Sequence, residues 1–152
     1  AEPLAEVDAG RALRLAAERI WLARGACVLR CPAIYGPDRG LAVRVRAGRH
    51  TIPGDGSMMM SRIHVEDLAR CALAAADHPG RALPVGDLEP APHREVVAFI
   101  CERFGVPMPA SIPLAEAHET LRHGRAVRAQ RTLALLGVER ASPSYRDGIG
   151  AA

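Results

Sequence analysis

Polar side chains that could bind a small molecule are concentrated between residues 62 and 67. The guanidinium group of Arg62 suits a phosphate or a carboxylate, and a solvated surface charge is the alternative for this residue. His64 has no carboxylate or cysteine at catalytic or metal-ligand spacing apart from Glu66 and Asp67, which suit the first turn of a helix. A hydrogen-bonded structural histidine is therefore the alternative for His64. Arg62 and His64 are thus candidates for substrate contact, and we assign no catalytic residue.

Met59 is a third candidate for substrate contact. It lies in a run of three methionines, whose soft side chains are typical of a cleft lining or an interface rather than a metal site. The segment Gly54 to Met59 carries the first two glycines of a dinucleotide fingerprint, lacks the third and leads into an extended segment. Because that fingerprint requires a helix whose N-terminus meets the pyrophosphate, we expect a turn here and no phosphate loop.

The cysteines lie in apolar surroundings, and their spacing matches no zinc site. Such residues are typical of buried free thiols in a reducing compartment, which predicts a cytoplasmic protein without a metal site. The four are Cys27, Cys31, Cys71 and Cys101.

The composition excludes several classes of function. All 20 basic residues are arginine, so mechanisms that need a lysine, such as a Schiff base or the phosphate-binding lysine of a P-loop, are absent. Aromatic residues make up only 3% and the arginines are scattered, which argues against a nucleic-acid partner. The sequence has no apolar run of about 18 residues, so we expect no membrane-spanning segment.

The elements that must position these residues form an α/β pattern. Residues 26–37 predict a short buried strand, apolar on both faces, that runs into a tight turn. A second short strand is expected at 82–85. The expected helices are 9–24 with Asp8 as N-cap, 41–47, 65–77 and 93–104, with further candidates at 114–122 and 127–136. This order predicts parallel strands with right-handed crossovers.

The strand at 26–37 requires neighbours that the sequence around it does not supply. A strand that is apolar on both faces is normally central, and two strands do not make a stable sheet. Residues 1–25 hold only a loop and a helix, in which Leu13, Ala16, Ala17 and Ile20 recur at helical spacing. Either another chain pairs with the strand, as in a homodimer that covers its open edge, or the sequence is the back half of a larger domain.

The motifs occur in an order that resembles the carboxyl-terminal half of the NAD-dependent epimerases/dehydratases, in the extended or atypical short-chain dehydrogenase/reductase superfamily. Arg30 to Pro37 resembles the family's R-x-x-x-[VI]-Y-G-P loop, and Arg62 to Ala69 resembles its R-I-H-V-x-D-[LV]-A segment. Phe104 to Pro107 is similar to its L-G-x-P ending. Leu135 to Gly137 and Pro143 to Gly148 are similar to its closing L-G-x and P-x-[YF]-x-x-G.

The resemblance implies a fold and a division of the chain. The fold would be the C-terminal part of a Rossmann-like, doubly wound parallel sheet with a small substrate-binding subdomain, in a single partial domain over residues 1–152. Residues 1–37 and 64–86 would belong to the sheet and helix layer. Residues 38–63 and 87–152 would belong to the substrate side.

The resemblance also implies NAD or NADP for the complete protein, with the loop residues Pro32, Ala33 and Tyr35 beside the nicotinamide. The family's Tyr-x-x-x-Lys pair would fall at Gly10 and Arg14, which cannot replace it, since glycine has no proton to give and arginine does not act like lysine. We expect the substrate-binding half of an NAD(P)-dependent oxidoreductase acting on a sugar nucleotide or related small molecule, inactive alone and retaining no cofactor tightly. The alternative is a non-catalytic module that binds a small ligand or a protein.

Overall fold

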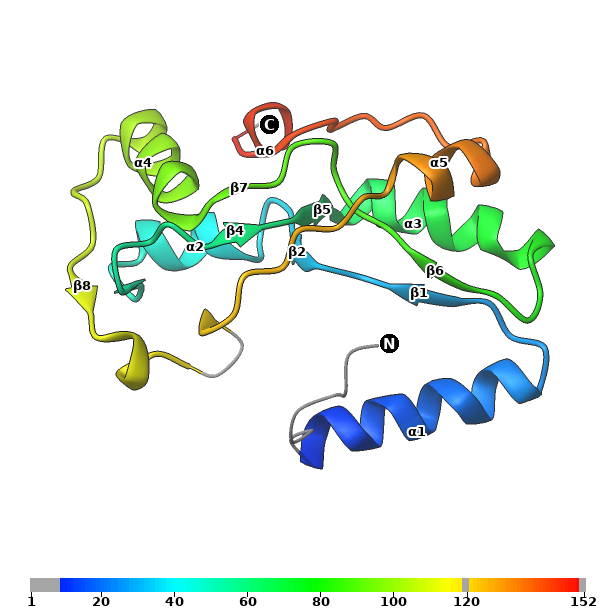
Figure 1. The fold of residues 1–152 in the computed structure, drawn as a ribbon. Helices are drawn as coiled ribbons and strands as arrows, with labels where there is room; N and C mark the ends of the chain where they lie inside the picture. The colour runs from blue at the N-terminus through cyan, green and yellow to red at the C-terminus, as the bar shows by residue number, and fades with distance from the viewer. Residues whose placement is uncertain (1–8, 119–120, 151–152) are drawn as a thin grey trace.

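The computed structural model describes residues 9–118 and 121–150, so the predicted N-cap Asp8 lies outside the described residues. The chain forms two lobes, which meet where strand β2 (Ala33–Tyr35) runs parallel to β5 (Arg62–His64) (Figure 1). The loop that the sequence singles out at 30–37 and the polar segment at 62–67 therefore lie next to each other at the junction of the lobes.

The first lobe is built on a parallel pair of strands, β1 (Val28–Arg30) and β6 (Ala82–Pro84). Helices α1 (Ala9–Ala23) and α3 (Val65–Ala74) lie on opposite sides of this pair (Figure 1). A 3₁₀ turn, η1 (Ala75–Asp77), extends α3 to the end of the predicted helix. Parallel strands flanked by helices confirm the α/β class that the order of the elements predicts.

The stretch 26–37, predicted as one buried strand, consists of two short strands. Pro32 has no N–H to donate to a ladder, and the chain leaves β6 there and continues as β2 toward β5. Helices lie on both sides of the β1–β6 pair as predicted (Figure 1), but the strand is less buried than predicted, since Val28 and Leu29 are only partly buried and Cys31 is exposed. Within the described ranges β1 pairs with β6 alone, so its other edge has no strand partner.

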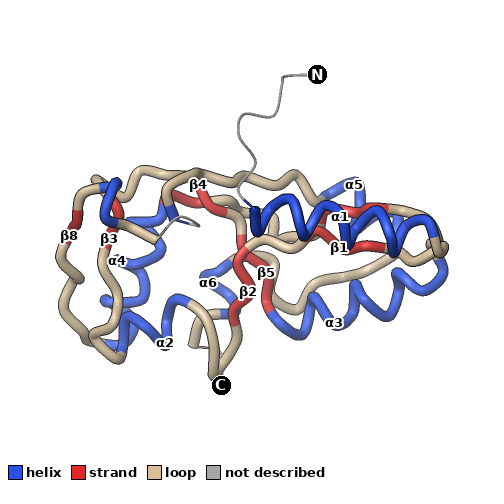
Figure 2. The backbone as a smooth tube through the Cα atoms, turned by 90° about the horizontal axis from the view of Figure 1, so that it is seen from below, coloured by secondary structure: helices blue, strands red, loops and turns tan. Residues whose placement is uncertain are grey.

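The second lobe combines two helices with two very short strand pairs. Its elements are α2 (Leu41–Arg46), α4 (His93–Phe104), the parallel pair β3 (Ile52–Pro53) and β8 (Ser111–Ile112), and the antiparallel pair β4 (Met59–Met60) and β7 (Ala91–Pro92). Figure 2 shows β3 and β8 side by side at the outer end of this lobe. Between β3 and β4, Asp55 accepts hydrogen bonds from the N–H and hydroxyl of Ser57, which confirms a turn rather than a phosphate loop.

Each lobe has its own hydrophobic core. The core of the second lobe gathers side chains of α2, α4 and the C-terminal turn around Ile52, Ile100 and Tyr145, which are fully buried. The core of the first lobe packs α3 and β6 around Ile63 and Cys71. Because Ile63 and Tyr35 lie on the two paired strands of the junction, the cores are anchored on either side of the same β2–β5 ladder.

The C-terminal segment returns across both lobes. α5 (Gln130–Leu136) packs against α3, and α6 (Tyr145–Gly148) lies beside β5 (Figure 1). The helix predicted at 114–122 is wrong over most of its length, since Leu114–Glu116 forms only a 3₁₀ turn, η2. Residues 119–120 of that range lie outside the described residues.

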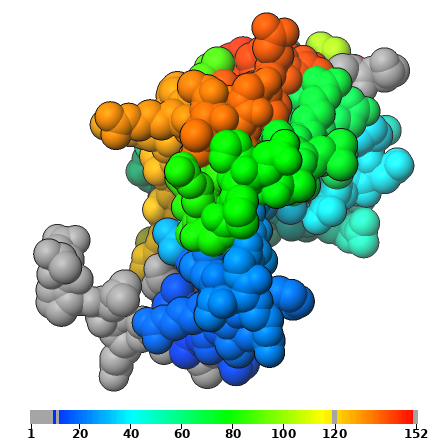
Figure 3. All heavy atoms as spheres, turned by 90° about the vertical axis from the view of Figure 1, so that its right-hand side faces the viewer, coloured from blue at the N-terminus to red at the C-terminus, as the bar shows by residue number. Residues whose placement is uncertain are grey.

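The apolar stripe predicted on the first helix is exposed rather than buried. Leu13 is 72% exposed and Ile20 53%, while the opposite side of α1 turns Leu15 and Leu22 toward β1. Seen end-on, α1 lies on the side of the molecule away from α5 (Figure 3). In the part of the chain that the structure covers, none of the helices has the length and apolar character needed to cross a membrane.

Candidate functional site

A cavity of about 690 Å³ lies at the junction of the lobes. Its walls come from the loop leading into β2, the start of β5, helix α2, the segment around β3, and the stretch after β8. Pro32, Ala33, Tyr35 and Arg62 all line it. The structure therefore brings together in one wall the three predicted cofactor-side residues and one of the three predicted substrate-side residues.

Met59 and His64 do not line this cavity. The neighbouring Met60 does, while Met59 turns outward and is 41% exposed. His64 is buried behind Tyr35, with the two rings edge to face at 5.3 Å between centroids. Its Nδ1 is buried, and among the described residues it has no hydrogen-bond partner.

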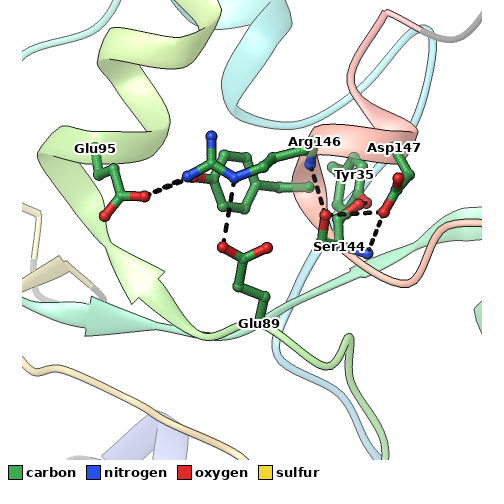
Figure 4. A network of polar contacts seen from close by, with 7 residues as sticks. Tyr35, Glu89, Glu95, Ser144, Arg146 and Asp147 are labelled. Atoms are coloured by element: carbon green, nitrogen blue, oxygen red, sulfur yellow. Dashed lines mark hydrogen bonds and ion pairs between the residues drawn. The ribbon is translucent and has the colours of Figure 1, made fainter.

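Tyr35 is held as a buried hydrogen-bond donor. Its hydroxyl donates to the backbone carbonyl of Ser144 at 3.1 Å, close to the α6 turn (Figure 4). Burial raises the pKa of Tyr35 well above its usual value, and the carboxyl groups of Asp87 and Asp67 raise it further. At neutral pH this phenol remains protonated, so it can donate a hydrogen bond but cannot act as a base.

Arg62 carries a positive charge into the cavity wall from a largely buried position. It is 3% exposed, and its Nη1 donates to the carbonyl of Met60 at 2.9 Å. Burial lowers the pKa of Arg62, while the nearby carboxyl of Asp87 opposes this effect. The other N–H donors of the rigid guanidinium fork make no hydrogen bond in the described part of the chain.

Asp87 is a buried carboxyl group that the sequence analysis did not identify. It follows β6, is 2% exposed, and its backbone N–H donates to the carbonyl of Arg62 at 2.7 Å. Neither carboxyl oxygen has a hydrogen-bond partner within the described residues. Burial raises the pKa of Asp87 to about 7, although Arg62 and Arg140 favour its charged form.

A pair of histidines in the cavity wall was also missed by the sequence analysis. His50 and His93 are buried, and their Nε2 atoms lie 2.9 Å apart. Burial and the positive charge of Arg44 lower the pKa of His50 to about 4; burial, His50, Arg62 and Arg44 do the same for His93. Both rings are therefore neutral at pH 7, and the Nε2–H of one ring donates a hydrogen bond to the Nε2 of the other. Because the two histidines are 43 positions apart, the sequence does not reveal this contact.

The cavity is lined by more positive than negative side chains. Arg44, Arg49 and Arg125 join Arg62 in the lining, whereas Glu116 is its acidic side chain. Within 9–118 and 121–150, these three arginines have no ion-pair partner. The described residues contain no group of three or more His, Cys, Asp or Glu that could hold a metal ion. Such a cavity suits an anionic ligand held by guanidinium groups.

The back of the site is fixed by two carboxylates that bind the C-terminal segment. Asp67 lies in the first turn of α3, as predicted. Its carboxylate also accepts hydrogen bonds from the backbone N–H groups of Ala141 and Ser142, at 2.8 and 2.9 Å. Asp147 accepts from the N–H and hydroxyl of Ser144 in a capping box at the start of α6 (Figure 4). These bonds hold the carbonyl of Ser144 where Tyr35 reaches it.

A salt-bridge network fastens the same turn to the second lobe. Arg146 on α6 bonds Glu95 on α4 at 2.6 Å and Glu89 at 3.4 Å, and the hydroxyl of Tyr145 donates to Glu95 at 2.8 Å (Figure 4). Since these charged groups are about half exposed, the network contributes more to orientation than to stability.

Known proteins resemble this chain over most of its length, although no family model matches it. It is 33% identical to the 3-diazoavenalumate denitrifying reductase of a Streptomyces species over 138 residues, which cover 81% of this chain and 45% of that protein. A functionally unknown protein from Silicibacter pomeroyi has the same fold, with a TM-score of 0.81 and 32% identity over 98% of this chain and 57% of the other.

A dehydratase of known structure shares the fold as well. The dTDP-glucose 4,6-dehydratase of Bacillus anthracis, solved in complex with NAD, matches with a TM-score of 0.74 and 21% identity, covering 97% of this chain and 51% of that one. The chain spans about half the length of the relatives it matches. This coverage is consistent with the predicted resemblance to one half of such a protein. The chain therefore shares the Rossmann-like fold of NAD-dependent epimerases/dehydratases.

Proposed function

We propose that this chain is the substrate-binding half of an NAD(P)-dependent oxidoreductase of the epimerase/dehydratase or reductase type, and that the cavity at the lobe junction receives a small acidic substrate. The observation that carries the proposal is the placement of the loop residues Pro32, Ala33 and Tyr35 in one wall with the buried guanidinium of Arg62. Cofactor-side and substrate-side groups must meet in this way for a hydride to pass between two bound molecules.

The described residues suit the nicotinamide end of an NAD or NADP cofactor but not its pyrophosphate. The loop at 32–35 presents backbone and an aromatic ring to the cavity, which suits the flat carboxamide end of the cofactor. In the part of the chain that the structure covers, the glycine turn at 54–56 does not open a helix, so it offers no pyrophosphate site. We therefore expect this chain alone to retain NAD or NADP weakly.

The residues of this chain bind and orient rather than transfer protons. The cofactor, when bound, would supply or accept the hydride. Tyr35 stays protonated at neutral pH, and Gly10 and Arg14 replace the family's Tyr/Lys pair. Arg62 would hold an acidic group of the substrate, with His64 packed edge to face against Tyr35 to keep that wall in place. Met59 would contact only those parts of a substrate that extend beyond the cavity.

The organisation of the complete protein follows from the same proposal. Residues 1–37 and 64–86 would form part of the nucleotide-binding layer, and 38–63 and 87–152 the substrate side. The free edge of β1 would be covered in the assembled protein, by further strands or by a second copy of the chain. The four cysteines of the chain, all among the described residues, form no disulfide, which suits a protein of the reducing cytoplasm.

Titration with NADH tests this proposal directly. NADH fluorescence should change little with this chain alone, and it should saturate at micromolar concentrations with the longest natural form of the protein that contains the chain. The same longer form should oxidise NADPH or NADH in the presence of a small acidic carbonyl or sugar-nucleotide substrate. Micromolar NADH binding by the chain alone would contradict the division of labour proposed here, and absence of binding by the longer form would contradict the function.

A further inference from the structure

We infer that the part of the cavity formed by Arg44, Arg49 and the His50–His93 pair is a binding site for an oxyanion, a carboxylate or a phosphate group, carried by the substrate. This inference rests on the proposed function, since it concerns the ligand of the same cavity, and it adds a second anchoring point beyond Arg62. None of these four residues belongs to the segments that resemble the family motifs.

Arg44 and Arg49 form no ion pair within the described residues. Arg44 lies in the last turn of α2, Arg49 follows that helix, and both line the cavity. The ion pairs of the described residues all lie elsewhere: Arg30–Glu18, Arg70–Asp67, and Arg146 with Glu89 and Glu95. Two guanidinium groups that face the same cavity without a carboxylate partner suit an anionic ligand, which can accept their N–H groups in bidentate geometry.

The two imidazoles of the site are buried and in contact with each other. His50 precedes β3 and His93 begins α4, so the 2.9 Å contact between their Nε2 atoms joins two elements of the cavity wall. The contact requires one ring to donate and the other to accept, so the two rings cannot both be doubly protonated while it persists. His93 is 2% exposed, and its Nδ1 has no hydrogen-bond partner within the described residues. A buried polar atom without a hydrogen-bond partner makes the folded protein less stable, and such atoms are often found in binding sites.

The histidines and the arginines of the site are electrostatically coupled. The charged groups that act on the pair are Arg44 from α2 and, for His93, Arg62 from β5; the lining also contains Glu116 and His118. Arg44 lowers the pKa of both histidines, which shows that its positive field reaches them. A bound oxyanion would offset this field, so its arrival should raise the pKa of His50 and His93. The pair thus reports on occupation of the site.

Histidine NMR with simple oxyanions tests the inference without any cofactor. Inorganic phosphate and D-glucuronate are the probes, and D-glucose is the uncharged control. We expect saturable shifts of the His50 and His93 imidazole signals, and a rise in their pKa, with phosphate, with glucuronate or with both. The two arms distinguish a phosphate-bearing from a carboxylate-bearing substrate. Glucose should shift neither signal. Absence of saturable shifts with both anions up to about 10 mM would overturn the inference.

Variants identify the site. Arg44→Ala should weaken binding of the effective anion about 10- to 100-fold, since a charge-assisted hydrogen bond is lost. The matched control is Arg131→Ala on α5, an exposed arginine outside the cavity, which should change binding less than about twofold. If Arg44→Ala fails to fold, Arg44→Lys keeps the charge, loses the fork and should still bind more weakly than the natural protein. Equal binding by the Arg44 and Arg131 variants would overturn the assignment.

The NMR titration tests the oxyanion site, and the NADH titration tests the proposed function independently of it. Anion-dependent histidine shifts without NADH binding by the longer protein would support the oxyanion site and contradict the oxidoreductase proposal. NADH binding without anion-dependent shifts would support the oxidoreductase and overturn the oxyanion site.

Discussion

The backbone N–H of Asp87 donates to the carbonyl of Arg62 at 2.7 Å, and this bond places a buried carboxyl group behind the guanidinium that lines the cavity. Asp87 follows β6 of the first lobe, and Arg62 begins β5 at the lobe junction. The two residues form no ion pair within 4.0 Å, so the charge on each depends on burial as well as on the other. The charge of the cavity wall is therefore sensitive to the protonation of a residue that does not itself line the cavity.

Asp87 should make the protein less stable as the pH rises. Its pKa is about 7 in the folded protein against 3.8 for an ordinary aspartate, so the folded state keeps a proton that the unfolded state releases between these values. Its contribution is fully favourable below about pH 4 and is lost as the pH rises through 7. Asp87→Asn should remove this dependence and raise the free energy of unfolding at pH 8 by about 2 kcal/mol.

Urea unfolding at pH 5 and pH 8 measures this effect. Asp38→Asn, at an exposed position, is the control and should leave the difference between the two pH values unchanged. An equal pH dependence in the natural protein and the Asp87→Asn variant would show that Asp87 ionises normally in the fold.

The His50–His93 pair should act in the opposite direction. The folded pKa of each ring is about 4 against 6.5 for an ordinary histidine, so the unfolded state binds protons first as the pH falls. Stability from the neutral pair is fully present above pH 6.5 and is lost as the pH falls toward 4. We expect a loss of about 2 kcal/mol between pH 7 and pH 4.5.

A double variant separates this effect from that of Asp87. His50→Gln with His93→Gln should be less stable than the natural protein at pH 7 and should lose less stability on acidification. The measurement is best made in an Asp87→Asn background, since the pH ranges in which Asp87 and the histidines change the stability overlap. A variant with the same acid sensitivity as its parent would show that the histidines are not the groups that take up the protons.

The sequence predicts those parts of the structure that depend on local pattern. The helix at 93–104 matches α4 at both ends, and the helix at 65–77 matches α3 with its 3₁₀ extension, because each has an apolar face that its own lobe buries. The Tyr35 loop and Arg62 were identified from motif order, and they do meet in the cavity wall.

Long-range contacts account for what the sequence did not predict. His50 and His93 each look like an isolated polar residue at the end of an element, and only the tertiary fold brings them to 2.9 Å. The same holds for Asp87, whose burial depends on packing around Arg62 and Arg140. The apolar stripe through Leu13 and Ile20 correctly marks a helix, but its exposure shows that periodicity does not identify the neighbour that an apolar face contacts.

Asp67 should be essential for holding the C-terminal segment. It is completely buried, and its two carboxylate oxygens each accept a backbone N–H, from Ala141 and from Ser142. Asp67→Ala would leave both N–H groups without a partner, which should cost about 3 kcal/mol of unfolding free energy. Arg70→Ala removes only the half-exposed partner of Asp67 and should cost less than about 1 kcal/mol. Thermal unfolding of the two variants measures the difference, and equal losses would contradict the proposed anchoring.

Gly148 should tolerate no side chain, because α6 approaches Tyr35 at this residue. A β-carbon there would lie 2.6 Å from the Tyr35 hydroxyl, 2.8 Å from its Cε2 and 3.0 Å from Cβ of Ser142. Gly148→Ala should therefore displace the ring that donates to Ser144, and we expect a loss of about 2 kcal/mol or more. Gly86→Ala is the matched control, since its added β-carbon would meet its nearest neighbour at an ordinary 3.6 Å and should cost less than about 1 kcal/mol. If both variants unfold at the same urea concentration, α6 is free to move away from Tyr35, and the cavity wall is not held by this contact.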